Sequence, residues 1–362
     1  MRRLIFRLVG FVAVFHAYVY WKLRRGFGAG WWSWLCFVWV AAFTLFPIAR
    51  YYEMAGTGRF VEIFFALTIT EYVIMGMMAS MIVAAEILKV VLSLWDRVAG
   101  THAEDFVTPR RIVTLPLAIV LCVVVYSFYE AWDLREVHLV IPAPKLPQDV
   151  ERLRIVQISD IHLGGVYPAG HLRRVMEMVR AASPDIFVVT GDLVDGNMAG
   201  RGAEAGLVSD HEARYGAFGV IGNHEHYSGL EESIEFMEQA GLTVLYDQAV
   251  SVAGITIVGL DDLTRVWPPG LKTPPDRFVL LLRHRPDVIK TSRGKFDMQL
   301  SGHTHGGQLW PLGLVSQRMQ GYVQGLSKQD GSYVYVSNGT GFWGPPMRFF
   351  APPEVTVIDL RR

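Results

Sequence analysis

The stretch Gly302-His303-Thr304-His305-Gly306-Gly307-Gln308 places two histidines two residues apart, with glycine on both sides. In an extended segment, residues i and i+2 point to the same side, so both imidazoles can face one pocket. The glycines let the backbone come close to whatever occupies that pocket. Alone, the pattern is also typical of a solvent-exposed loop. Other parts of the sequence are needed to distinguish a binding pocket from such a loop.

Polar residues follow predicted strands throughout the second half of the chain. Apolar segments predict strands at residues 153–159, 185–190, 218–221, 255–259, 278–282, 298–300, 333–337 and 355–360, and helical spacing predicts helices at 170–182 and 230–240. A strand–helix–strand start followed by many strands favours mixed sheets covered by helices. The blocks at the strand ends are Asp160-Ile-His162, Gly191-Asp192-Leu-Val-Asp195, Gly222-Asn223-His224-Glu225, His284 and Gly302-His303-Thr304-His305.

These blocks carry carboxylate, imidazole and amide groups at the carboxyl ends of strands, where α/β folds place their sites. Such groups suit divalent metals such as Mn, Fe or Zn. Taken alone, Asp160 or Asp192 could equally cap a helix. Five blocks in this order, each at a strand end, favour one shared metal site.

The order of the blocks resembles the calcineurin-like metallophosphoesterase superfamily, whose pattern is D-x-H, G-D-x-x-D, G-N-H-[D/E], H and G-H-x-H. The resemblance covers about residues 150–362, with all five blocks intact. The segments Gly302–Pro311, Gly344–Arg348 and Pro352–Glu354 look similar to a subgroup of membrane-attached bacterial phosphodiesterases and UDP-diacylglucosamine pyrophosphatases of lipid A synthesis. At Asn338 such relatives often have a basic residue, so the expectation of a phosphate contact is weakened there.

The resemblance implies a four-layer αββα sandwich of two mixed sheets that binds two divalent metal ions. It implies hydrolysis of a phosphodiester or pyrophosphate bond by a metal-bridging hydroxide, with no phosphoenzyme. His224 would protonate the leaving oxygen or stabilise charge on the phosphate, and Asp195 would orient His224. The implied ligands are Asp160, His162 and His305 for the first metal, Asn223, His284 and His303 for the second, and Asp192 bridging both.

The first third of the chain has the composition of a membrane segment. Four apolar runs, each close to the ~20 residues that cross a bilayer as a helix, predict an all-α bundle of about four transmembrane helices. The run near the N-terminus could instead be a signal peptide, but no small-residue cleavage site is evident and three more runs follow. The runs are Leu4–Trp21, Trp31–Ala49, Ile63–Leu88 and Ile112–Trp132.

The sequence thus divides into a transmembrane region at 1–135, a proline-rich linker at 136–150 and a phosphoesterase domain at 151–362. We expect a multi-pass protein of the cell membrane. Basic residues are spread almost evenly over alternate loops, so the side of the catalytic domain stays open. Glu71, inside the third run, either faces the bundle interior as a functional group or lies near an interface.

Two further features have two interpretations each. Aromatic residues beside prolines, at Trp267, Trp310 and 342–343, either form an apolar lip beside the metals or pack within loops. Arg348 either contacts substrate phosphate or is an ordinary structural arginine. His171 is expected to be solvated.

The leading hypothesis is a membrane-anchored, two-metal phosphoesterase whose phosphoester substrate could be lipid-linked. One alternative is a UDP-2,3-diacylglucosamine-type pyrophosphatase. Another is a non-catalytic metal-binding membrane module or sensor, against which His224 and Asp195 argue because a scaffold needs no leaving-group acid. The net charge of zero gives no case for nucleic-acid binding, and the oligomeric state stays open.

The four-span hypothesis makes a topological prediction. Reporter fusions after residues 28, 56, 103 and 140 should alternate between the two sides of the membrane, since each intervening run would cross it once. Alkaline phosphatase and fluorescent-protein fusions at the same positions control for expression. Signals from the same side at 28 and 56 would defeat the hypothesis.

Overall fold

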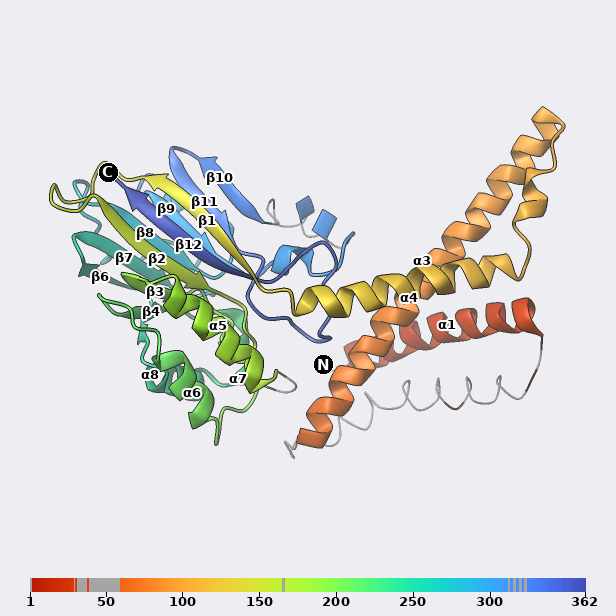
Figure 1. The fold of residues 1–362 in the computed structure, drawn as a ribbon, viewed down its shortest axis with the longest axis horizontal. Helices are drawn as coiled ribbons and strands as arrows, with labels where there is room; N and C mark the ends of the chain where they lie inside the picture. Colours follow the sequence, from red (N-terminus) through yellow and green to blue (C-terminus); the bar gives the residue numbers. More distant parts are fainter. Residues whose placement is uncertain are drawn as a thin grey trace. The chain divides into compact units, whose positions relative to one another are not determined.

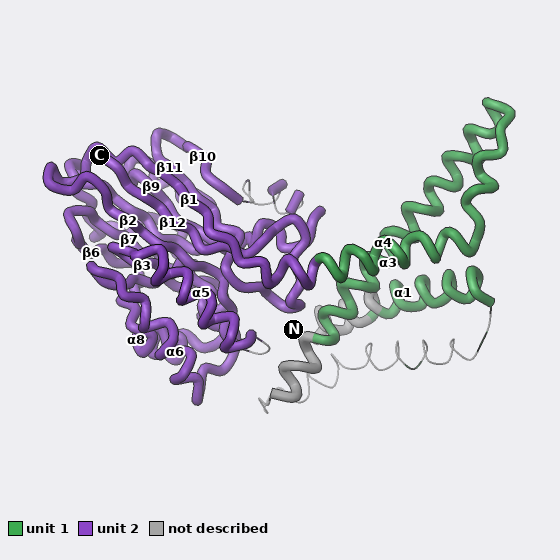
Figure 2. The backbone as a smooth tube through the Cα atoms, viewed as in Figure 1, with its two compact units in different colours: residues 1–126 green, residues 127–362 purple. Residues whose placement is uncertain are grey.

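The computed structural model describes residues 2–28, 30, 38, 59–164, 167–311, 313–314, 317–318, 321 and 324–362. The chain forms two compact units, residues 1–126 and 127–362 (Figure 2). Each unit contains hydrophobic clusters of its own.

The first unit is helical, with α1 (Arg2–Phe27), α3 (Arg59–Ala99) and most of α4 (Arg111–Ala131). Among the described residues, two stretches are long and apolar enough to cross a membrane: Leu67–Ala99 and α4. Of the about four transmembrane helices that were expected, this part of the chain contains two candidates by length and composition.

The other two predicted runs have different outcomes. The run Leu4–Trp21 lies in α1, but many of its side chains fall outside the described residues, so the structure does not test it as a span. The run Trp31–Ala49 lies, except for Val38, outside the described residues.

Ionisable side chains join α1 to α3. His16 Nε2 lies 2.7 Å from Glu71 Oε1, and both side chains are buried. Lys22 and Tyr18 both donate to Glu86. Glu71 therefore faces a neighbouring helix, where ionisable groups of membrane helices are usually found.

The second unit contains two six-stranded mixed sheets (Figure 1). The first sheet has the order β1 (Arg135–Pro142), β12 (Glu354–Arg361), β2 (Arg152–Ile158), β3 (Ile186–Val189), β4 (Ala217–Gly219), β5 (Thr243–Val244). The second has the order β10 (Gly325–Gln329), β11 (Ser332–Val336), β9 (Met298–Ser301), β8 (Val279–Arg283), β7 (Ile255–Leu260), β6 (Gln248–Val252). All eight predicted strands are present; β1, β5, β6 and β10 were not predicted.

The sheets pack face to face around an apolar core. Ile155 and Val188 from the first sheet belong to the same buried cluster as Ile257, Leu280 and Leu300 from the second. The central strands are buried on both faces, which explains why they read as nearly continuous apolar runs.

Three helices cover the opposite face of the first sheet: α5 (Ala169–Ala181), α6 (Gly202–Ser209) and α8 (Leu230–Gln239) (Figure 1). The predicted helices at 170–182 and 230–240 correspond to α5 and α8. In α5 the spacing of the buried Leu172, Val175 and Val179 places one apolar face on the sheet. The short α7 (Asn223–Ser228) begins just beyond β4.

The prediction of a four-layer αββα sandwich is only partly correct. Two mixed sheets and one helical layer are present. The outer face of the second sheet packs instead against Trp267, Ile289 and Phe296, which lie in loops among the described residues. Bulky loop side chains bury the apolar face of the sheet there in place of helices.

The predicted linker at 136–150 is also wrong in structural terms. β1 pairs in parallel with β12 over its whole length, so residues 136–142 are part of the first sheet. Ala143 and Leu146, in the proline-rich turn that follows, are buried in the core between the sheets. The prolines fix a packed turn and do not separate two mobile parts.

Gly259 in β7 provides a test of how closely the sheets approach. A Cβ atom at this position would lie 2.2 Å from Leu245 Cβ and 2.8 Å from Val220 Cγ1. We expect Gly259→Ala to lower the free energy of unfolding by about 1–3 kcal/mol, as overpacked cores do. Gly170→Ala, on open space in α5, is the control and should not destabilise. Equal melting temperatures for the two variants would contradict the close approach.

Candidate metal centre

The predicted site residues come together where strands of both sheets end. β2, β3 and β4 are parallel neighbours in the first sheet, and β8 and β9 are parallel neighbours in the second. The loops after these strands carry Asp160 and His162, Asp192 and Asp195, Asn223 and His224, His284, and His303 and His305. Parallel strands end at a common edge, which explains why five distant blocks meet.

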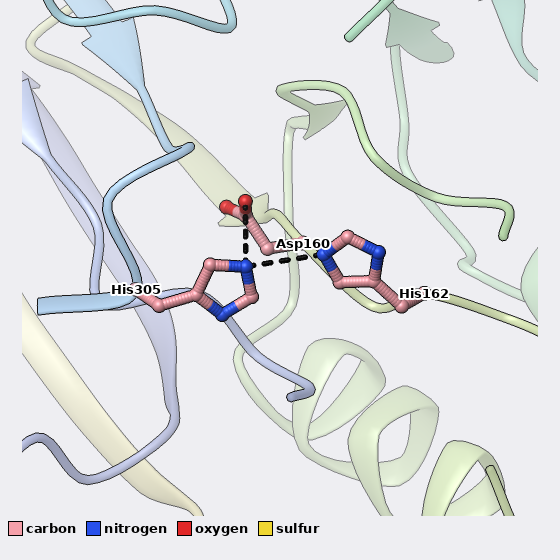
Figure 3. Close-up of side chains that lie close together, drawn as sticks. All are labelled: Asp160, His162 and His305. Atoms are coloured by element: carbon pink, nitrogen blue, oxygen red, sulfur yellow. Dashed lines mark hydrogen bonds and ion pairs between the residues drawn. The ribbon is translucent and has the colours of Figure 1, made fainter. Parts of the chain in front are cut away.

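The first cluster consists of Asp160, His162 and His305 (Figure 3). His305 Nε2 lies 3.1 Å from His162 Nε2 and 3.4 Å from Asp160 Oδ1. All three residues are buried. Two imidazole nitrogens and a carboxylate oxygen therefore point toward one small volume.

The second cluster consists of Asp192, His284 and His303. His284 Nε2 lies 3.0 Å from Asp192 Oδ2 and 3.2 Å from His303 Nδ1. The same Asp192 oxygen lies 3.9 Å from His162 Nε2 in the first cluster. Asp192 is thus positioned between the two clusters.

Asn223 begins α7, directly before His224, whose backbone N–H donates to Asp192 Oδ1. The Asn223 side-chain oxygen is buried and has no hydrogen-bond partner in the structure. A buried amide oxygen without a partner is unfavourable unless something else binds it. A cation beside the second cluster would satisfy this oxygen.

The protonation states of the imidazoles fit cation binding. Burial lowers the pKa of His162 to about 4 and that of His303 to about 3, and it lowers the pKa of His305 well below its usual value. Neutral imidazoles have a free lone pair, which metal binding requires. His284 differs: burial lowers its pKa, but Asp192, with Asp160 and Asp262, outweighs burial and raises the pKa to about 10. A cation would have to displace that proton.

His224 and Asp195 form a pair at the edge of the first cluster. His224 Nδ1 lies 3.1 Å from Asp195 Oδ1, and its ring packs edge-on against His162. Burial lowers the pKa of His224, but the hydrogen bond with Asp195 and the negative charges of Asp192, Asp195 and Glu225 together outweigh this, and the net shift is upward. The imidazole therefore holds a proton more readily than usual.

The ligand-bearing loops have unusual backbone geometry. Asp160, His162, Asp192, His303 and His305 all have φ between 51° and 71°. Residues other than glycine rarely adopt this left-handed conformation, and such residues gather at functional sites. The surrounding structure thus holds these five side chains in directions that a relaxed loop would not favour.

Glu225 is an important residue to which the sequence analysis gave no role. Its buried carboxylate accepts hydrogen bonds from the backbone N–H groups of Asp192, Leu193, Val194 and Gly222, at 2.7–3.2 Å. It thereby ties the loop after β3 to the loop after β4. The glutamate of the Gly-Asn-His-Glu block was the available signal.

Arg348 has a structural role. Its guanidinium is fully buried and donates to the carbonyls of Gly341 and Ala351, with Nη2 3.4 Å from His305 Nδ1. Its backbone N–H donates to Ser127 in the last turn of α4. Arg348 therefore supports the loop behind His305, which favours the structural interpretation over phosphate contact.

The aromatic residues separate into two kinds. Trp267 and Phe342 are buried, whereas Trp310 and Trp343 are 54% and 52% exposed. The Trp343 ring lies 6.0 Å from the His224 ring. The expected solvation of His171 is wrong, because its ring is buried and contacts Trp132.

Comparison with known proteins agrees with this arrangement. The family model described as "Calcineurin-like phosphoesterase" matches residues 153–307. An "Uncharacterized metallophosphoesterase" of Aquifex aeolicus is 35% identical over 249 residues, which cover 65% of this chain and 95% of the relative. The chain belongs to the calcineurin-like phosphoesterase family. As a member, it is a metal-dependent phosphoester hydrolase.

Two further similarities are more distant. A "Transmembrane protein with metallophosphoesterase domain" of Danio rerio is 31% identical, over 70% of this chain and 63% of the relative. The crystal structure of a dimetal phosphatase from Danio rerio matches 52% of this chain and 87% of its own at 13% identity, with a TM-score of 0.36. That score is too low to carry an argument about this chain.

The shared position of Asp192 leads to a prediction about metal content. Asp192→Asn removes a negative charge from both clusters, so we expect less bound Mn and no measurable phosphodiester hydrolysis. Elemental analysis and turnover of bis(p-nitrophenyl) phosphate measure the two effects. The exposed Asp210 gives a matched control, Asp210→Asn, which should leave both unchanged. Full activity with normal metal content in Asp192→Asn would exclude a shared role.

Proposed function

We propose that this protein is a membrane-anchored phosphoesterase that uses two divalent metal ions to hydrolyse phosphodiester or pyrophosphate bonds. The position of Asp192 between two clusters of buried imidazoles supports this most strongly. Mn, Fe and Zn remain the candidate metals, because carboxylate and imidazole ligands suit each of them. The ligands would be Asp160, His162 and His305 for the first ion, Asn223, His284 and His303 for the second, and Asp192 for both.

Two such ions, when bound, supply an activated water and stabilise charge on the attacking and leaving oxygens. The protein's own residues hold a proton in position and transfer it. Since His224 Nδ1 faces Asp195, its Nε2 is left to donate to the leaving oxygen. Asp195 fixes the tautomer and the ring orientation of His224.

The His224–Asp195 pair also argues against a non-catalytic metal-binding module or sensor. Neither residue belongs to the first or the second cluster, although His224 also lies within reach of His162 and Asp192. A proton-holding imidazole with an orienting carboxylate suits protonation of a leaving group or stabilisation of charge on a phosphate, and a binding module needs neither.

Membrane anchoring and the exposed aromatics support an amphipathic substrate. α3 and α4 contain the candidate spans, and a relative is named as a transmembrane protein. Trp343, exposed beside His224, offers an apolar surface to a substrate that binds there. A lipid-linked phosphoester, including a UDP-2,3-diacylglucosamine-type pyrophosphate, is the substrate class that we propose on this basis. The protein would then be a multi-pass protein of the cell membrane.

The leaving-group role of His224 can be tested with two esters. His224→Gln should keep the metals but lose ~10²–10⁴-fold in rate on an alkyl ester, as expected for a lost general acid. The loss should be smaller on a p-nitrophenyl ester, whose leaving group needs little protonation. Asp195→Asn should show a milder form of the same pattern, and the double variant should be little worse than His224→Gln.

The control is His211→Gln. His211 is half-buried, and its Nδ1 accepts a hydrogen bond from the backbone N–H of Ala213. This variant should keep the wild-type rate on both esters. Turnover number and metal content are measured for every variant. Equal losses on the alkyl and aryl esters would remove His224 from the leaving-group role.

A further inference from the structure

Arg285 occupies a position beside the second cluster that none of the proposed ligand or proton-transfer roles uses. It follows His284 directly, beyond the end of β8. Its Nη1 lies 3.3 Å from His303 Nε2. Its side chain is 31% exposed, so the guanidinium is open to solvent on one side.

A buried carboxylate holds this guanidinium in a fixed orientation. Arg285 Nε lies 2.7 Å from Asp262 Oδ1, and Nη2 lies 3.1 Å from Asp262 Oδ2. The Asp262 side chain is fully buried. The Arg285 carbonyl also accepts from the side chains of Gln299 and Ser301. Two parallel hydrogen bonds fix the plane of the guanidinium, and Nη1 takes part in neither of them, so its contact in the structure is with His303.

The contact with His303 is compatible with only one tautomer of that histidine. His303 Nδ1 faces His284 Nε2 at 3.2 Å, so Nδ1 is the nitrogen that belongs to the second cluster. A neutral imidazole has one N–H and one lone pair. If Nδ1 gives its lone pair to a cation, Nε2 must carry the proton and becomes a donor. It can then no longer accept from Arg285.

Metal binding would therefore free the Nη1 donors while Asp262 still holds the guanidinium in place. An anion bound at the two divalent ions would lie next to this fixed guanidinium and be attracted by it. The non-bridging oxygens of phosphate suit a guanidinium, whose planar donors match them.

We propose that Arg285, held by Asp262, binds a non-bridging oxygen of the substrate phosphate next to the second metal. This subsite rests on the proposed two-metal function and adds to it a preference for phosphate groups that carry a free anionic oxygen. Phosphodiesters and pyrophosphates have such an oxygen, whereas phosphotriesters do not.

The test measures binding of inorganic phosphate to the full-length, Mn-loaded protein in detergent by calorimetry. Arg285→Gln should raise the dissociation constant for phosphate about 10- to 100-fold, the effect of losing a hydrogen bond to a charged group. The Mn content should stay at the wild-type value. Arg285→Lys keeps the charge but not the paired geometry, and should be intermediate. Arg293→Gln removes an exposed arginine paired with Asp330 and should bind phosphate normally.

A second variant covers the case in which Arg285→Gln fails to fold because Asp262 is left buried and unpaired. The double variant Arg285→Gln/Asp262→Asn leaves no buried charge at this position, and it should show the same loss of phosphate affinity. Unchanged phosphate affinity in either folded variant would overturn the proposal. Loss of Mn from the folded variants would also overturn it, because Arg285 would then support only His303.

The outcomes separate this proposal from the proposed function. A wild-type protein that binds phosphate through Arg285 yet hydrolyses no ester would contradict the function alone. An active hydrolase whose phosphate affinity does not depend on Arg285 would contradict the subsite alone.

Discussion

The buried carboxylate of Asp192 lies between the two imidazole clusters, and several elements of the surrounding structure contact it. One of its oxygens lies near His284 and His162, and the other accepts from the backbone of His224. Its own backbone N–H donates to Glu225. Buried charges are tolerated only when they are paired, and each of these contacts supplies a partner. Residues that follow β2, β3, β4 and β8 therefore meet at this carboxylate.

Close approach of backbone to carboxylate makes this network possible. A Cβ atom at Gly222 would lie 2.2 Å from Asp192 Oδ1, and one at Gly302 would lie 2.1 Å from Asp160 Oδ2. Side chains at these two positions would occupy the space of the carboxylates. The glycines next to the polar blocks are thus required by packing at the site as well as by the turns.

Each of the two sheets supplies its own set of side chains to the site. The first sheet supplies carboxylates and the His224–Asp195 pair, and the second supplies His284, His303 and His305. Glu225 joins two loops of the first sheet, and Asp262 holds Arg285 on the second. Since both sheets share one apolar core, small changes in their packing would be felt at the metal positions.

The sequence by itself determined the central strands and the order of the polar blocks, because buried strands read as apolar runs and polar residues stand out at their ends. It also determined two long apolar helices. It could not reveal that Arg135–Pro142 pairs with β12, since that partner lies more than 200 residues away and β1 is half-exposed. Nor could it show which aromatics are exposed, that His171 is buried, or that loops replace helices over the second sheet. Only the tertiary structure decided these points and the place of Arg285, because each depends on contacts between segments far apart in the chain.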